Sequence, residues 1–486
     1  MPTFYVENFG CRATQADGAA IERQFQVRGL DRASSAASAA LVILNTCTVT
    51  ASADQDARAA IRRVRRQNPG CAIVVTGCYA QRAPEEVAAL PGVSQVIGNS
   101  HKHRLAELAL LHSGTDASNS GAAFVPLSAL RTGNGELTTA LSRPAADGQR
   151  LFVSDIFAHT ELLAAPVFEA GGEATENART RPNLKIQDGC DNRCSFCVIP
   201  SVRGHSRSLP LDRILHEVNT LVAAGYREVV ISGINLGRWG RDLPVWGGRP
   251  FDSAQGRPRP PKFEALVRAI LSETSLEKLR LSSIEPMDWS DELIALIAES
   301  PRIAKHAHVP MQSGSDRILR RMHRKYRPWH YREKIEKIRA AMPDAAIGAD
   351  VMVGFPSETE ADFEETRRMI DELPFTYLHV FTYSSRPGTP SAAMRDQVPM
   401  QVARERNRIL RALAAEKKLA FMRSFVGETI SAITLNFTHN GPDGDFTEAL
   451  TDNYLKLRLQ GRHNPNCWLT AQVKEVESEG LCGIAS

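Results

Sequence analysis

The chain has 486 residues, of which 43% are hydrophobic and 23% charged, and its formal net charge is +4. This length predicts two to four domains with enough apolar residues for packed cores. No run approaches the twenty or so apolar residues of a membrane span, so none is expected, and the nearly neutral charge neither requires nor excludes a nucleic-acid partner.

The first region, residues 1–111, alternates short strands and helices. Strands are expected at 4–9, 41–44, 72–75 and 93–97, and helices at 14–27, 52–66, 84–90 and from about 102. This alternation predicts an open parallel sheet with helices on both faces. The start of the chain reads as a strand and lacks the features of a signal peptide, so we expect a reducing, cytoplasmic location.

Three cysteines of this region follow predicted strands. Cys11 follows the first strand through Gly10, Cys47 follows the second and Cys78 the third. Carboxyl ends of parallel strands meet at the edge where open α/β sheets bind ligands, so three thiols there could hold an iron–sulfur cluster. The alternative is that each is a small buried hydrophobic residue, as free cysteines often are. Three equivalent placements favour a site, whereas Cys71 precedes its strand and is excluded.

The expected helix at 52–66 also carries basic residues on one face. Arg58, Arg62 and Arg66 recur every four residues. They could form a track for RNA phosphates, or a solvated helix face. The near-neutral net charge gives the first interpretation little extra support.

Residues 112–180 are expected to be a linker or insert. The segments 113–121 and 132–148 are rich in Gly, Ser, Thr and Ala, which is typical of loops. A strand is expected at 150–154, leading towards the next domain.

The central region, residues 181–415, again alternates strands with helices, the clearest helix being at 358–371. Strands are expected at 183–187, 228–232, 278–282, 306–310, 346–353 and 377–382. Six strands with crossover helices predict a partial (β/α)6 barrel, with functional groups at the carboxyl ends of its strands. The stretch 239–261 is dense in Gly, Pro and Arg and reads as a surface insert.

This region holds the most informative motif of the chain, the Cys-x3-Cys-x2-Cys run of Cys190, Cys194 and Cys197. Such a loop can place three thiolates around one face of a cubane [4Fe–4S] cluster and leave one iron open to a substrate. The alternative is half of a zinc site with His205 as a further ligand, but no second Cys-x2-Cys or His pair follows. An odd count of nine cysteines argues against a disulfide framework.

The last region, residues 422–486, changes character. Polar and apolar residues alternate at 428–435 and 454–459, and less regularly at 468–476, with turn sequences between them. This pattern predicts a small antiparallel β-barrel.

The cysteine run and its flanks, Leu184–Gly204, resemble the signature of the radical S-adenosylmethionine enzymes and, among them, of the methylthiotransferases. The segments Gly10–Gln15, Asn45–Val49 and Thr76–Gln81 resemble the three N-terminal motifs of that family, and the Thr451–Leu455 segment resembles its RNA-binding TRAM domain. The resemblance implies two [4Fe–4S] clusters. Cys190, Cys194 and Cys197 would bind the one that chelates S-adenosylmethionine, and Cys11, Cys47 and Cys78 an auxiliary one that carries the sulfur.

The resemblance also implies contacts with S-adenosylmethionine at strand ends of the central region. Their expected positions are Gly233 and Asn235 for the amino group, Ser283 and Glu285 for the ribose, and Val353 and Gly354 for the adenine. The alternative at each position is a tight strand-to-helix turn without a ligand. No catalytic side chain beyond the cluster ligands is expected.

By this resemblance the chain methylthiolates C2 of an adenosine beside the tRNA anticodon. The segments Lys185–Gly189 and Met322–Tyr326 are most similar to the branch that acts on threonylcarbamoyladenosine. Other branches act on isopentenyladenosine or on an aspartate of a ribosomal protein, and a non-catalytic Fe–S or zinc RNA-binding protein is the alternative outside the enzymes. The expected partners are the anticodon loop of tRNA, an electron donor of flavodoxin or ferredoxin type and an undetermined sulfur donor.

Overall fold

The computed structural model describes residues 2–110, 143–144, 150–163, 180–244, 260–441, 444–477 and 480–486. Most of the expected linker at 112–180 and of the expected insert at 239–261 lies outside the described residues. The chain divides into two compact units. Unit 1 comprises Met1–Gly10, Ile21–Thr48 and Ser52–His159, and unit 2 comprises Cys11–Ala20, Val49–Ala51 and Thr160–Ser486.

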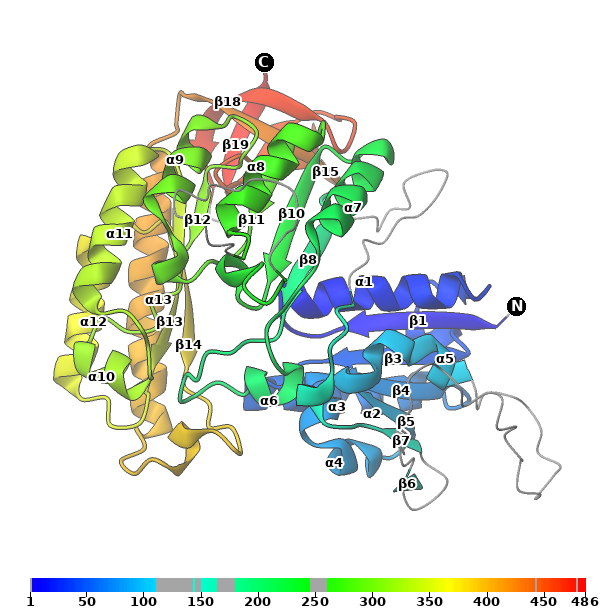
Figure 1. The fold of residues 1–486 in the computed structure, drawn as a ribbon. Helices are drawn as coiled ribbons and strands as arrows, with labels where there is room; N and C mark the ends of the chain where they lie inside the picture. The colour runs from blue at the N-terminus through cyan, green and yellow to red at the C-terminus, as the bar shows by residue number, and fades with distance from the viewer. Residues whose placement is uncertain are drawn as a thin grey trace. The chain divides into compact units, whose positions relative to one another are not determined.

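Unit 1 is built on a seven-stranded sheet in the order β2-β1-β3-β4-β5-β7-β6 (Figure 1). Its strands are β1 (Thr3–Asn8), β2 (Asp31–Arg32), β3 (Leu41–Thr46), β4 (Ala72–Gly77), β5 (Val93–Gly98), β6 (Arg143–Pro144) and β7 (Arg150–Phe152). Only β6, at one edge, is antiparallel to its neighbour. The helices are α2 (Ala51–Gln67), α3 (Cys78–Arg82), α4 (Pro84–Ala88), α5 (Leu105–Leu110) and the end of α1 (Arg12–Gln26), whose residues up to Ala20 belong to unit 2. The predicted parallel α/β architecture is confirmed.

The ends of three central strands of this sheet lie in register. Asn8 of β1 pairs with Asn45 of β3, and Thr46 of β3 pairs with Gly77 of β4. All six residues of β3 are buried, because helices cover both faces of a parallel sheet. The cysteines that follow β3 and β4 therefore begin at one edge of the sheet.

The central part of unit 2 is the predicted open barrel of six parallel strands with helices outside them (Figure 1). The strands are β8 (Asn183–Asp188), β10 (Glu228–Gly233), β11 (Lys278–Leu281), β12 (His306–His308), β13 (Ala346–Val353) and β14 (Tyr377–Thr382). The longer helices are α7 (Leu211–Ala223), α8 (Phe263–Glu273), α9 (Asp291–Glu299), α11 (Pro328–Ala341), α12 (Glu360–Glu372) and α13 (Met400–Arg423). Hydrogen bonding divides the strands into the sheets β11-β10-β8-β9 and β12-β13-β14. The short antiparallel β9 (Arg207–Ser208) was not predicted, because two residues carry no alternation.

The C-terminal part of unit 2 is a closed five-stranded barrel, as predicted. Its strands are β15 (Thr429–Gly441), β16 (Gly444–Thr451), β17 (Lys456–Gln460), β18 (Trp468–Val476) and β19 (Leu481–Ala485). The sequence did not predict β16 and β19. β19 closes the barrel by pairing parallel with β17, a non-local contact that local alternation cannot reveal.

A buried ion pair joins this small barrel to the larger one. Arg280 of β11 and Glu228 of β10 are both fully buried and lie 2.7 Å apart, from Nε to Oε1. Arg280 also donates hydrogen bonds to the backbone carbonyls of Asp452 and Thr451, at 3.0 and 3.3 Å. A buried charge is stable only when its donors are satisfied, so this arginine fixes the loop between β16 and β17. Among the described residues, no helix combines the length and apolar character needed to cross a membrane.

Candidate functional site

The cysteine loop of unit 2 begins where β8 ends. Gly189, which follows Asp188, has φ of +71°, and a Cβ there would lie 1.9 Å from the His205 carbonyl oxygen. Only glycine can occupy this position. The amide of Cys190 then donates to the carbonyl of Gly204 at 3.1 Å. This hydrogen bond joins the first cysteine of the loop to Gly204, which lies in the segment after the loop.

The middle of the loop is attached to a second segment of the barrel. The Ser195 amide donates to the Met322 carbonyl at 3.1 Å, and the Ser195 hydroxyl donates to the Arg321 carbonyl at 2.7 Å. The segment Met322–Tyr326 was one of the two that resemble the threonylcarbamoyladenosine branch. It therefore packs directly against the cysteine loop.

Three donors point at the sulfur atoms of this loop. The Asn192 amide and Asn235 Nδ2 lie 3.4 and 3.8 Å from Cys190 Sγ. Arg324 Nη1 lies 3.3 Å from Cys194 Sγ. Hydrogen bonds and positive charge favour thiolate over thiol, and such outer partners tune a metal centre.

The three thiols fit a cluster better than a single metal ion. Burial raises the pKa of Cys190, and it raises the pKa of Cys197 to about 12, so metal binding would displace protons from both. Within the described residues, the Sγ atoms of Cys190, Cys194 and Cys197 do not all lie within 4.8 Å of one another. A zinc ion with Zn–S bonds of about 2.3 Å would hold them about 3.8 Å apart. His205, the other expected zinc ligand, is exposed and lies 2.9 Å from the Asp191 carboxylate.

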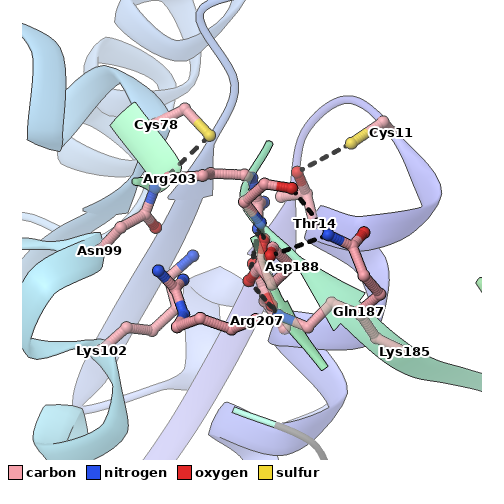
Figure 2. Close-up of polar contacts among 12 residues, drawn as sticks. Cys11, Thr14, Cys78, Asn99, Lys102, Lys185, Gln187, Asp188, Arg203 and Arg207 are labelled. Carbon is pink, nitrogen blue, oxygen red and sulfur yellow. Dashed lines mark hydrogen bonds and ion pairs between the residues drawn. The ribbon is translucent and has the colours of Figure 1, made fainter. Parts of the chain in front are cut away.

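Four charged side chains form a buried cluster at the end of β8, namely those of Asp17, Lys185, Asp188 and Arg203, of which Figure 2 labels the last three. Arg203 lies 3.0 Å from the carboxylate of Asp17 and 2.9 Å from that of Asp188, and Lys185 pairs with both of them. Burial raises the pKa of Asp188, but Arg203 and Lys185 more than offset it and hold that pKa well below its usual value. Asp188 directly precedes the cysteine loop, and Asp17 belongs to α1. The sequence analysis missed this cluster because its members are far apart in the chain: Lys185 and Asp17 are separated by 168 positions.

Two of the expected S-adenosylmethionine contacts follow β10. A Cβ at Gly233 would lie 2.9 Å from Gln187 Oε1, and the Asn235 amide donates to that oxygen at 2.7 Å. Gln187, which the sequence did not single out, therefore holds this turn against β8. Because Asn235 also donates to Cys190, the turn lies beside the cysteine loop.

Ser283 and Glu285 follow β11. Glu285 pairs with Arg324, and both line a small cavity with Cys194 and Tyr326. Ser283 is half-buried at the same strand end. An acidic group thus stands beside the cysteine loop, in a position to accept hydrogen bonds from a ligand.

Val353 and Gly354, at the end of β13, offer only backbone to a ligand. The side chain of Val353 is buried in the apolar core. Gly354 has φ of +75°, and its amide donates to Glu358 Oε2 at 2.6 Å. A Cβ there would lie 2.5 Å from that of Ala403, so the turn requires glycine.

The cysteines after β3 and β4 of unit 1 are buried, each with 2% of its surface exposed. Gly10 has φ of +95°, and a Cβ there would lie 2.7 Å from Cys47 Sγ. Asn99 Nδ2 lies 3.5 Å from Cys78 Sγ (Figure 2). Cys11, the residue after Gly10, is exposed, and its Sγ lies 3.5 Å from the hydroxyl of Thr14.

The arginine face of α2 is partly engaged within unit 1. Arg58 donates to the Tyr79 hydroxyl at 2.7 Å and pairs with Glu86. One of the three arginines considered for an RNA track therefore already has an acidic partner.

Comparisons with known proteins follow this division of the chain. Residues 184–370 match the Radical SAM superfamily, and residues 3–98 match Uncharacterized protein family UPF0004. The chain is 33% identical, over 95% of its length and 91% of the relative, to Threonylcarbamoyladenosine tRNA methylthiotransferase MtaB of Bacillus subtilis. It is 32% identical to tRNA-2-methylthio-N(6)-dimethylallyladenosine synthase of Novosphingobium aromaticivorans, over 89% of the chain and 86% of the relative.

A solved structure supports the fold. The radical S-adenosylmethionine methyltransferase TsrM from Kitasatospora setae superposes with a TM-score of 0.54 at 15% identity, covering 80% of this chain and 74% of that one. S-adenosylmethionine and a [4Fe–4S] cluster are the cofactors that membership of the Radical SAM superfamily implies, and the matched residues include the Cys190–Cys197 loop. The chain therefore belongs to the radical S-adenosylmethionine family of tRNA methylthiotransferases.

Proposed function

We propose that this enzyme methylthiolates C2 of N6-threonylcarbamoyladenosine at position 37 of tRNA. The observation that carries the proposal is the loop of Cys190, Cys194 and Cys197, in which glycine turns and sulfur-directed donors prepare three ligands. Relatives named for threonylcarbamoyladenosine, at 32 to 34% identity, support the choice of nucleoside.

The two sets of cysteines take separate roles in this proposal. Cys190, Cys194 and Cys197 bind the cluster that receives S-adenosylmethionine, while Gly233, Asn235, Ser283, Glu285 and the backbone at Val353 and Gly354 contact that molecule. Cys11, Cys47 and Cys78 bind an auxiliary [4Fe–4S] cluster. When bound, these groups supply the radical chemistry and the methyl and sulfur atoms of the transferred group.

In this proposal the protein's own residues bind and orient these cofactors and protect them from solvent. Asn235 and Arg324 direct hydrogen bonds at Cys190 and Cys194, which stabilises their thiolates. Glu285, held by Arg324, keeps its carboxylate at the mouth of the cavity beside Cys194. An external electron donor of flavodoxin or ferredoxin type, a sulfur donor and a cytoplasmic, reducing setting complete the proposal.

Nucleoside analysis of tRNA tests the proposal. We would express the chain, or its Cys194→Ala variant, in a bacterium lacking its own threonylcarbamoyladenosine methylthiotransferase, and measure modified nucleosides by mass spectrometry. We expect the methylthio derivative of threonylcarbamoyladenosine with the wild type and none with the variant.

The second candidate substrate is isopentenyladenosine, which relatives named for dimethylallyladenosine at 32% identity favour. Methylthiolation of that nucleoside alone would replace the proposed substrate. Modification of a ribosomal-protein aspartate without any change in tRNA would contradict both choices. No cleavage of S-adenosylmethionine by the reduced, reconstituted protein would favour a non-catalytic RNA-binding protein.

A further inference from the structure

The two faces of the barrel strands β12, β13 and β14 differ sharply in chemistry. Alternate residues on one face, among them Ala307, Val351 and Val353, belong to the apolar core under the helices. Side chains of a strand alternate between faces, so the remaining residues face the interior of the barrel. That inner set is polar and aromatic: His306, His308, Asp350, Met352, Tyr377 and His379.

Three of these inner residues converge. His308 Nε2 lies 3.4 Å from Asp350 Oδ1, and the rings of His308 and His379 have centroids 5.7 Å apart. One nitrogen or oxygen of each of the three side chains lies within 4.8 Å of those of the other two. His308 comes from β12, Asp350 from β13 and His379 from β14, so the fold and not local sequence brings them together.

This group is accessible and incompletely satisfied. His308 is 9% exposed, and its buried Nε2 has no hydrogen-bond partner among the described residues. A buried polar atom without a partner is destabilising, and a ligand that bonded to it would relieve that cost. The Asp350 side chain is 28% exposed and His379 is exposed, so a ligand can reach these two from solvent, and His308 Nε2 lies 3.4 Å from Asp350 Oδ1.

The charges around the group suit a polar ligand with both donors and acceptors. Burial lowers the pKa of His379, His308 and Arg12 lower it further and Asp350 opposes them, so the ring is neutral near pH 7. A neutral imidazole donates one hydrogen bond and accepts another, and Asp350 accepts only. Arg12, whose Nη2 lies 2.7 Å from the Tyr454 hydroxyl, adds positive charge nearby.

We propose that His308, Asp350 and His379 form a recognition site for the N6 substituent of the substrate adenosine. This inference rests on the proposed function and deepens it. A threonylcarbamoyl substituent carries a carboxylate, a hydroxyl and amide N–H groups, which the imidazoles and Asp350 can pair with. A dimethylallyl substituent is wholly apolar and would leave all three residues desolvated without partners, a strong basis for discrimination.

A divalent cation is the other ligand that two imidazoles and a carboxylate suit. Histidines that bind metals almost always donate their second ring nitrogen to a carboxylate or carbonyl. In the part of the chain that the structure describes, the carboxylate that lies against these rings is that of Asp350, 3.4 Å from His308 Nε2. Because Asp350 would itself be a ligand of the cation, neither ring has a further orienting partner among the described residues, which favours direct recognition of the substituent.

The test compares His379→Leu and Asp350→Asn with the wild type on two anaerobically assayed tRNAs, one bearing threonylcarbamoyladenosine and one dimethylallyladenosine. We expect each variant to raise KM for the first tRNA about tenfold or more, the loss of one hydrogen bond to a charged group, with a smaller change in kcat. His330→Leu, which removes an exposed histidine from the outer helix α11, should change neither constant.

Unchanged KM values in both variants, with a wild type active on threonylcarbamoyl-tRNA, would overturn this inference and leave the proposed function standing. A wild type inactive on that tRNA would overturn both. Elemental analysis separates the cation: one non-iron divalent metal per wild-type chain, lost in Asp350→Asn, would overturn direct recognition.

Discussion

The two sets of cysteines that we propose as iron–sulfur ligands are held in place in different ways. Cys190, Cys194 and Cys197 share one loop, whose backbone is bonded to Gly204 and Met322. Cys47 and Cys78 instead follow separate strands of one sheet, and their relative position depends on strand register. A contiguous loop can carry its geometry by itself, whereas ligands on separate strands need the whole domain folded.

The surroundings of the two sets differ as well. A buried guanidinium, Arg324, points at Cys194, and two more donors point at Cys190. Cys78 receives only the neutral amide of Asn99 among the contacts described. Positive charge stabilises the more reduced state of a cluster, so Arg324 would favour electron uptake by a cluster bound at Cys190, Cys194 and Cys197.

The largest effect should come from removing one cysteine of each set. Cys194→Ala should abolish both 5′-deoxyadenosine formation and methylthiolation, because the cluster that receives S-adenosylmethionine is lost. Cys78→Ala should abolish methylthiolation alone. Chromatography of 5′-deoxyadenosine and mass spectrometry of tRNA nucleosides measure the two products.

Cys467→Ala, in the loop before β18, is the matched control and should alter neither product. If Cys78→Ala also lost 5′-deoxyadenosine formation, the two sets of cysteines would not act separately, and the comparison would fail.

Removing the positive charge of Arg324, which lies beside Cys194, should change the reduction potential of only one of the two proposed clusters. We expect Arg324→Gln to lower the reduction potential of the radical-site cluster by roughly tens of millivolts, because a positive charge and a hydrogen bond to sulfur are lost. Redox titration followed by electron paramagnetic resonance measures the shift. Arg320→Gln, an exposed arginine paired with Asp316, should leave the potential unchanged. An unshifted or higher potential in Arg324→Gln would contradict this account of the loop.

The buried charge cluster that precedes the Cys190–Cys197 loop should contribute to the free energy of unfolding. Asp17→Asn leaves Lys185 and Arg203 facing one carboxylate in a buried setting, and we expect a loss of about 3 kcal/mol in the free energy of unfolding. Glu405→Gln, which breaks an exposed pair with Arg408, should leave the free energy of unfolding almost unchanged, because solvent screens that pair. Thermal unfolding of both variants tests this, and equal small shifts would mean that the buried cluster adds no stability.

The smallest effect concerns the segment that follows Cys11. Tyr454→Phe removes the hydroxyl that accepts a hydrogen bond from Arg12, worth about 1 kcal/mol. We expect a few-fold fall in methylthiolation with 5′-deoxyadenosine formation unchanged, because Arg12 directly follows Cys11 in the chain and is not among the described residues that contact the Cys190–Cys197 loop. Single-turnover assays of both products provide the measurement, and an equal fall in both would show a general loss of structure instead.

The sequence predicted most of this architecture because its signals are local. Strand β13 matches its expected bounds of 346–353, and the helix expected at 52–66 is α2. Strand β19 was missed, since it contains Gly483 and is defined by its parallel partner β17.

The site shows the same limit. The Cys190 loop and the strand-end cysteines were visible as spacings, whereas the pairing of Asp17 with Lys185 and the convergence of His308, Asp350 and His379 arise only from tertiary structure. Gln187, which holds the turn at Gly233, carried no spacing signal either.

The most direct test of the two-cluster account is the iron and acid-labile sulfide content per chain after anaerobic reconstitution, with Mössbauer spectra. The wild type should contain about eight irons and the Cys11/Cys47/Cys78→Ala variant about four, all in cubane clusters. About four irons in both proteins would contradict the account, because the N-terminal cysteines would then hold no cluster.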